Sequence, residues 1–90
     1  KRQGHLVSGN YLDYIELEGA YNVVKIHTPA HVVGYTIEDA RVHERFGITV
    51  VGIKSPSKEF EYGSKELIMH RNDELIIMGK QNQIDRFLRS

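Results

Sequence analysis

The sequence contains no cysteine, no tryptophan and only two prolines among its 90 residues. The absence of cysteine excludes disulfides and thiolate chemistry and fits a reducing compartment. The 12 basic residues balance 12 acidic ones, so no overall field attracts nucleic acid or an anionic membrane. No apolar run approaches the ~20 residues that span a bilayer, and residues 1–10 lack the apolar segment of a signal peptide. These absences predict a small soluble cytoplasmic domain that binds no nucleic acid.

The motifs of common enzyme classes are also absent. The sequence has no phosphate-binding loop, no dinucleotide-binding glycine signature, no HExxH and no serine nucleophile elbow. His27 and His31 have the helical spacing of two zinc ligands, but Pro29 between them indicates the end of a strand and a loop. We therefore predict that the protein is not an enzyme and holds no metal.

Two strands are predicted in the first half of the chain. Residues 1–10 have mixed polarity and no period, and we expect a linker from a preceding domain. The domain itself is expected to cover residues 11–90, and because the chain begins with Lys1, we expect a piece of a longer protein. Alternating residues predict a strand over 14–18, and a second apolar segment predicts a strand over 21–27.

A helix is predicted over residues 37–46, because Thr36 can cap its first turn and Gly47 suits a left-handed C-terminal cap. Strands are predicted over 48–54, 59–62 and 74–80, and residues 65–70 fit either a short strand or a loop. The last segment, residues 81–90, has the apolar spacing of a short amphipathic helix.

The helix predicted over residues 37–46 has two apolar edges. On a helical wheel, Ile37 and Ala40 lie on one side, and Val42 and Phe46 lie nearly opposite. The strand that follows is apolar on both faces. Two explanations remain open: a loop or the final helix covers the second edge, or that edge contacts a second copy of the domain. The residues predicted for such a dimer interface are Ile37, Ala40, Val42, Phe46 and Val51.

The sequence resembles the C-terminal domain of the TrkA/RCK regulators of potassium transport. The resemblance lies in SGNYLDYIELEGAYNVVKI, TIEDARVHERFGITVVGIKS and NDELIIMGKQNQIDRFL, and it extends from about Tyr11 to Leu88. The helix–glycine–strand unit at residues 45–48 and the turn, strand and glycine at Asp73, Leu75 and Gly79 match the family best. Asn72 stands where the family typically has glycine.

The resemblance implies an α+β fold with a small, mostly antiparallel sheet and two short helices, in the order β-β-α-β-β-β-α. It also implies a homodimer within a cytosolic gating ring that contacts a membrane-embedded potassium transporter or channel, at the inner face of the cell membrane. A regulatory ligand, cyclic di-AMP or a cation, would bind the cleft between two copies. The matching cleft positions are Ile37, Asp39, His43, Thr49 and Val50.

The sequence departs from the dinucleotide-binding members of this family at three places. His43 stands where they have arginine, Thr49 where they have asparagine, and residues 61–67 replace a proline-containing loop. Arginine grips a phosphate with two donors, whereas histidine offers one charged donor. His43 is therefore either a ligand-contacting group or an exposed polar residue with no special role. A purely structural dimerisation module with no ligand is the alternative function.

Overall fold

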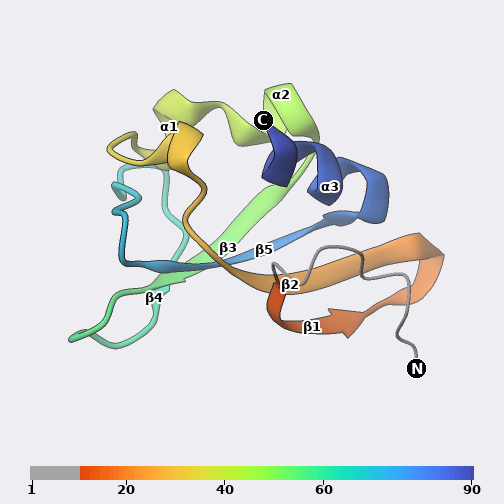
Figure 1. Cartoon of the computed structure of the whole chain (residues 1–90), viewed down its shortest axis with the longest axis horizontal. Helices are drawn as coiled ribbons and strands as arrows, with labels where there is room; N and C mark the ends of the chain where they lie inside the picture. The colour runs from red at the N-terminus through yellow and green to blue at the C-terminus, as the bar shows by residue number, and fades with distance from the viewer. Residues whose placement is uncertain (1–10) are drawn as a thin grey trace.

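The computed structural model describes residues 11–90, so the linker predicted for residues 1–10 lies outside the described residues. Five antiparallel strands form one sheet in the order β1-β2-β5-β3-β4. Figure 1 shows the labelled helices together on one side of this sheet. This arrangement confirms the predicted fold class. No helix within residues 11–90 is long and apolar enough to cross a membrane.

The strands follow the predicted pattern with small shifts at their ends. They are β1 (Tyr11–Glu16), β2 (Tyr21–His27), β3 (Thr49–Lys54), β4 (Glu61–Tyr62) and β5 (Glu74–Lys80). β1 lies earlier than the predicted strand over residues 14–18, because Gly19 and Ala20 take positive φ angles and reverse the chain into β2. The ambiguous segment 65–70 makes a single bridge, between Thr36 and Ile68. The last helix, α3 (Gln81–Arg89), is confirmed.

The prediction of one continuous helix over residues 37–46 is wrong. The structure has α1 (Ile37–Ala40) and α2 (Val42–Phe46), separated by Arg41 in the left-handed conformation with φ 52° and ψ 43°. The two predicted caps are confirmed: the Thr36 hydroxyl accepts from the Asp39 backbone N–H at 3.0 Å, and Gly47 is left-handed with φ 76°.

The break at Arg41 explains the two apolar edges of this segment. In a straight helix Ala40 and Val42 would point about 160° apart, yet both are only 3% exposed in the structure. The change of direction at Arg41 turns both side chains, and Phe46 after them, towards the same core. The second edge is therefore covered within the chain itself.

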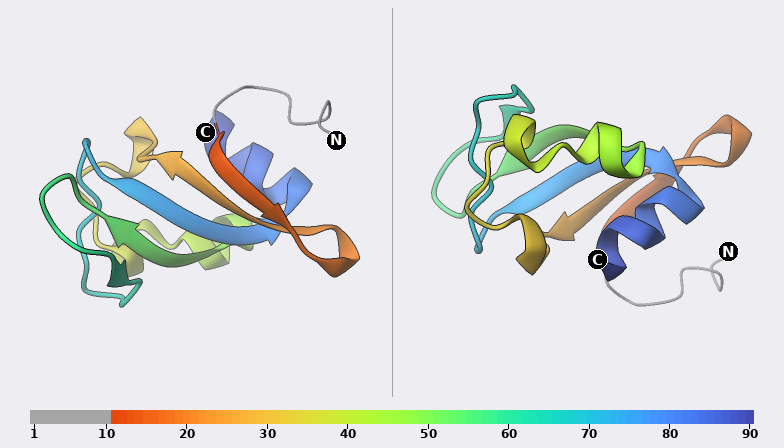
Figure 2. Two further views of the ribbon diagram at one scale, coloured as in Figure 1. Left: turned by 90° about the horizontal axis from the view of Figure 1, so that it is seen from below. Right: turned by 90° about the horizontal axis from the view of Figure 1, so that it is seen from above.

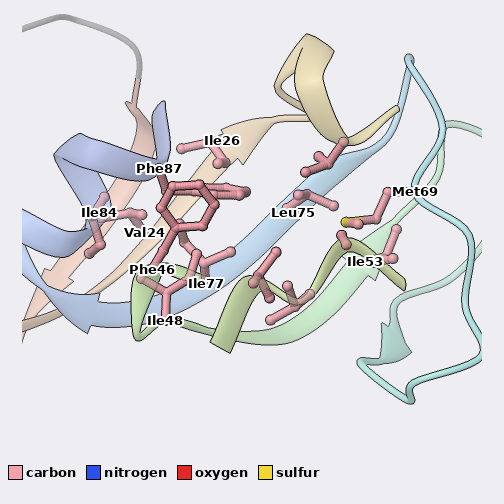
Figure 3. Close-up of a cluster of buried hydrophobic side chains, with 14 residues drawn as sticks. Val24, Ile26, Phe46, Ile48, Ile53, Met69, Leu75, Ile77, Ile84 and Phe87 are labelled. Atoms are coloured by element: carbon pink, nitrogen blue, oxygen red, sulfur yellow. The ribbon is translucent and has the colours of Figure 1, made fainter. Parts of the chain in front are cut away.

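An aromatic cluster fixes α2 against α3 above the sheet. The Phe46 and Phe87 rings meet edge to face with centroids 5.3 Å apart, and the His31 ring contacts both, at 5.8 and 5.1 Å. His31 Nε2–H donates to the Phe87 carbonyl at 2.7 Å, which satisfies a backbone acceptor in the last turn of α3. Figure 3 shows Phe46 and Phe87 in the same buried cluster as Val24 and Ile77 of the sheet.

A polar network fixes the edge strand β1 to α3. The Tyr11 hydroxyl donates to Asp85 Oδ1 at 3.1 Å and accepts from Gln81 Nε2 at 2.7 Å. Asn22 of β2 donates to Gln81 Oε1 at 2.7 Å. Burial, together with the nearby Asp85 carboxylate, raises the pKa of Tyr11 to about 12, although the hydrogen bond from Gln81 opposes the shift. The network therefore holds the phenol in its neutral form.

We expect Arg41→Gly to stabilise the domain. A left-handed backbone costs a residue with a side chain about 1–2 kcal/mol, and glycine is free of that cost but loses more entropy on folding. The expected net gain in free energy of unfolding is about 0.5–1 kcal/mol, measured by urea denaturation. Glu44→Gly, within α2, is the matched control and should lower stability by a similar amount. A loss of stability in Arg41→Gly would contradict the left-handed assignment.

Because of the Tyr11 phenol, we expect the free energy of unfolding of the domain to fall at alkaline pH. Because the folded-state pKa of Tyr11 is raised above its ordinary value of 10.0, the unfolded chain loses this proton first. The contribution of the neutral phenol to the free energy of unfolding is complete below pH 10 and is lost as the pH rises through about 12. Urea midpoints measured from pH 9 to 12 should fall less steeply for Tyr11→Phe than for the wild type. Tyr62→Phe, at an 83% exposed position, should keep the wild-type slope.

Candidate ligand-binding site

The predicted ligand residues lie along one continuous segment from the start of α1 to the start of β3. Thr36 caps α1, Gly47 ends α2, and the chain then enters β3 at Thr49. The side chains of Asp39, His43 and Thr49 are all exposed. The structure therefore presents three of the five predicted residues to solvent, on α1, α2 and β3 respectively.

Val50 does not belong to an open cleft. Its side chain is 4% exposed and packs in the core, on the face of β3 that the helices cover. Its register partner on β5, Ile77, is fully buried. Because strand side chains alternate between faces, the exposure of Thr49 places Val50 inside. Val50 is therefore a core residue and offers little surface to a ligand.

Ile37 is half-buried and packs against the core, beside the loop that follows β4. Its backbone N–H donates to the Leu67 carbonyl at 2.9 Å, and the Glu38 N–H donates to the Lys65 carbonyl at 3.1 Å. The structure thus brings the start of α1 against residues 65–67, within the segment 61–67 where the family resemblance predicts a departure. Because Thr36 satisfies the next N–H, this helix start has no free donor there for an anion.

The residues predicted for the dimer interface divide into two groups. Ala40, Val42 and Phe46 are between 3% and 5% exposed, because the break at Arg41 turns them into the core of the single chain. Little surface remains on them for a second copy. Val51 is 38% exposed and Ile37 is half-buried, so these two keep accessible surface.

Two exposed arginines flank His43 in the sequence around α2. Arg41 precedes α2 and Arg45 lies within it, and both are exposed. The Arg45 guanidinium lies over the Phe46 ring at 4.9 Å, and Arg86 of α3 donates to the Arg45 carbonyl at 2.6 Å. These contacts tie α2 to α3. The left-handed Arg41 had no signal in the sequence, because arginine rarely takes a positive φ.

The histidine pair at residues 27 and 31 does not form a metal site. His27 is exposed at the end of β2, whereas His31 is wedged between Phe46 and Phe87 and bonded to the Phe87 carbonyl. Within the described part of the chain, no group of three histidine, cysteine or acidic residues is arranged to hold a metal ion. The role of His31 was not predicted, because its neighbours in space come from α2 and α3.

Comparison with known proteins identifies the family. The sequence pattern of the TrkA-C domain matches residues 23–90. The Ktr system potassium uptake protein C of Bacillus subtilis (strain 168) is 33% identical over 88 residues, covering 97% of this chain and 40% of that protein. The Ktr system potassium uptake protein A of the same organism is 31% identical over 78 residues, covering 87% of this chain and 35% of that protein. The chain thus spans about two-fifths of the length of these relatives.

Solved structures support the same assignment. The RCK C domain of the potassium transport protein KtrA, in complex with cyclic diadenosine monophosphate, is similar with a TM-score of 0.66 and 26% identity, covering 74% of this chain and 79% of that one. The GsuK RCK domain has a TM-score of 0.69 at 16% identity, covering 83% of this chain and 16% of that one, which is a likeness of fold. From its sequence pattern and its fold, the chain belongs to the TrkA-C domain family.

Proposed function

We propose that this chain is the regulatory, ligand-binding and dimerising domain of a cytosolic subunit that controls a membrane-embedded potassium transporter or channel. Two observations support the proposal: its curated relatives are potassium uptake proteins, and a structural relative was solved with cyclic diadenosine monophosphate bound. The domain works by binding and supplies no chemistry of its own. Its place in the cell is the inner face of the membrane, through its partner.

The ligand site that we propose is the exposed surface formed by Asp39, His43 and Thr49. In the single chain these side chains are open to solvent, whereas small-molecule sites bury most of the surface of their ligand. A ligand held there therefore needs a second surface to enclose it, and the same residues of a second copy supply one. This geometry is the observation that carries the proposal.

The chemistry of the site suits a phosphodiester ligand of modest affinity. The exposed segment around α2 carries Arg41, His43 and Arg45, and the exposed Glu38, Asp39 and Glu44 keep its total charge near zero. Because His43 replaces the arginine of dinucleotide-binding relatives, each copy offers one donor where a guanidinium offers two. Regulation follows when the ligand binds one relative orientation of the two copies better than another.

Titration calorimetry with cyclic di-AMP tests this proposal. We expect His43→Arg to raise the affinity about 10-fold or more, because it adds a bidentate phosphate contact from each copy. His27→Arg is the matched control, since His27 is also exposed but lies at the end of β2; its affinity should equal that of the wild type.

Two results would count against the proposed site. An equal gain in both variants would indicate non-specific attraction by added positive charge. No heat and no thermal shift from cyclic di-AMP or from a panel of cations, in the wild type and in His43→Arg, would favour the purely structural dimerisation module.

A further inference from the structure

Arg41 takes a backbone conformation that its side chain disfavours. It lies between α1 and α2 with φ 52° and ψ 43°. Figure 2, right, looks onto the helices from above and shows α1 and α2 as two separate yellow-green coils joined at this point. Glycine takes this conformation without steric cost, and asparagine and aspartate take it more readily than arginine. The fold therefore requires a left-handed residue here but does not require an arginine.

The backbone of Arg41 is fully used within the chain. Its N–H donates to the Glu38 carbonyl at 3.1 Å, and its own carbonyl accepts from the Arg45 N–H at 2.8 Å. The first bond ends α1 and the second lies within α2. Because both bonds involve main-chain atoms only, glycine at this position would make them equally well. The side chain of Arg41 contributes nothing to them.

The guanidinium of Arg41, by contrast, has no partner within residues 11–90. Arg41 is exposed, and among these residues its side chain takes part in no hydrogen bond, ion pair or ring contact. In a continuous helix it would lie next to Glu38 and Glu44, three residues before and after it, and such oppositely charged neighbours attract each other. The left-handed turn interrupts that spacing. The turn that strains the backbone therefore also frees the side chain.

The other arginine beside His43 is already engaged. The Arg45 guanidinium lies over the Phe46 ring, 4.9 Å from its centroid. Arg86 lies over the same ring at 5.6 Å and donates to the Arg45 carbonyl at 2.6 Å. Moving the Arg45 guanidinium onto an anion would cost its contact with the ring. Arg41 is thus the arginine beside His43 that can bind an anion without giving up a contact in the described part of the chain.

Arg41 also lies close to the proposed ligand surface. Asp39 and His43 are each two residues away from it, so their Cα atoms lie within about 7 Å of the Arg41 Cα. The long, flexible side chain of arginine can cover such a separation. The guanidinium can therefore reach a ligand that contacts His43.

A guanidinium supplies two properties that the rest of this surface lacks. Histidine offers a phosphate one charged donor, whereas the planar guanidinium offers two parallel donors and keeps its charge at any physiological pH. The Asp39 carboxylate repels an anion, and the charge of Arg41 offsets that repulsion. A cyclic dinucleotide has two phosphodiester groups, and two copies of the domain would present one Arg41 to each.

We propose that Arg41 is the phosphate-binding residue of the ligand surface, with its guanidinium on a phosphodiester group of the ligand. This inference rests on the proposed function for the existence of that surface. It adds the group that holds the phosphate, and it accounts for an arginine at a position where glycine costs less. Residues in such conformations cluster at binding sites, where strain is retained for function.

The first test compares ligand affinity with stability in Arg41→Gly. Glycine keeps the left-handed backbone and removes only the guanidinium, so we expect the variant to fold more stably than the wild type. In titration calorimetry with cyclic di-AMP, its dissociation constant should rise at least about 10-fold, because a charge-assisted contact is lost from each copy. A purely structural role of Arg41 predicts no loss of affinity in a variant that folds more stably.

Two matched variants accompany this test. Arg41→Lys keeps the positive charge but loses the two parallel donors, so its affinity should fall between those of the wild type and Arg41→Gly. Arg71→Gly removes the same charge from an exposed position in the turn before β5. Its affinity for cyclic di-AMP should equal that of the wild type.

A second measurement follows the guanidinium itself by nuclear magnetic resonance. The Nε–H resonance of Arg41, identified by its absence from the spectrum of Arg41→Lys, should shift when cyclic di-AMP is added. The Nε–H resonance of Arg45 should shift less, because that guanidinium is held over the Phe46 ring.

The outcomes separate this inference from the proposed function. Equal affinity for cyclic di-AMP in the wild type and Arg41→Gly overturns the role of Arg41 and leaves the ligand surface in place. An equal loss in Arg41→Gly and Arg71→Gly also overturns it, because it indicates a general effect of charge. No binding by the wild type or by His43→Arg overturns the proposed function, and the role of Arg41 with it. A loss confined to position 41, with a shifted Arg41 resonance, supports the inference.

Discussion

The left-handed turn at Arg41 is the constraint on which most of this structure depends. A positive φ costs an arginine about 1–2 kcal/mol. It allows Ala40, Val42 and Phe46 to enter the same core, and burying a valine or a phenylalanine side chain contributes about 1.5–3 kcal/mol each. The burial outweighs the strain. The same turn leaves His43 on the outer side of α2, so the core and the candidate ligand surface depend on one backbone conformation.

The core that this turn completes is held by residues distant in sequence. Phe46 meets Phe87, and His31 bridges the two rings and bonds to the end of α3. At the opposite edge Tyr11 reaches α3 through Gln81 and Asp85. The final helix therefore contacts the first strand, the loop after β2 and α2, and it closes the domain on one side only.

Closing one side leaves the other side of the sheet apolar. Within residues 11–90 the helices cover a single face of the sheet, and the exposed residues of its other face, such as Ile15 and Met78, would be expected to be polar if that face remained in water. The proposed ligand surface is also incomplete in a single chain, because the exposed side chains of Asp39, His43 and Thr49 cannot enclose a ligand by themselves. A second copy placed against the ligand surface would enclose the ligand and couple it to the relative orientation of the two copies.

The sequence by itself determined most of the elements and the family. Alternation predicted β2 and β5, the Thr36 and Gly47 caps were read from residue type, and the spacing of Ile84 and Phe87 predicted α3. These features are local, since capping and periodicity depend on residues within one or two turns. Family resemblance likewise came from the order of short motifs.

Which apolar residues are core and which are surface depends on contacts between distant segments, and local sequence signals do not reveal them. The helical wheel separated Ala40 from Val42, but Arg41 brings them together, and no propensity of arginine signals that turn. Thr49 and Val50 appeared as neighbours at one cleft, yet the sheet points them to opposite faces. His31 gained its role from Phe46 and Phe87. Periodicity gives the faces of an element, whereas the packing of distant segments decides which face is covered.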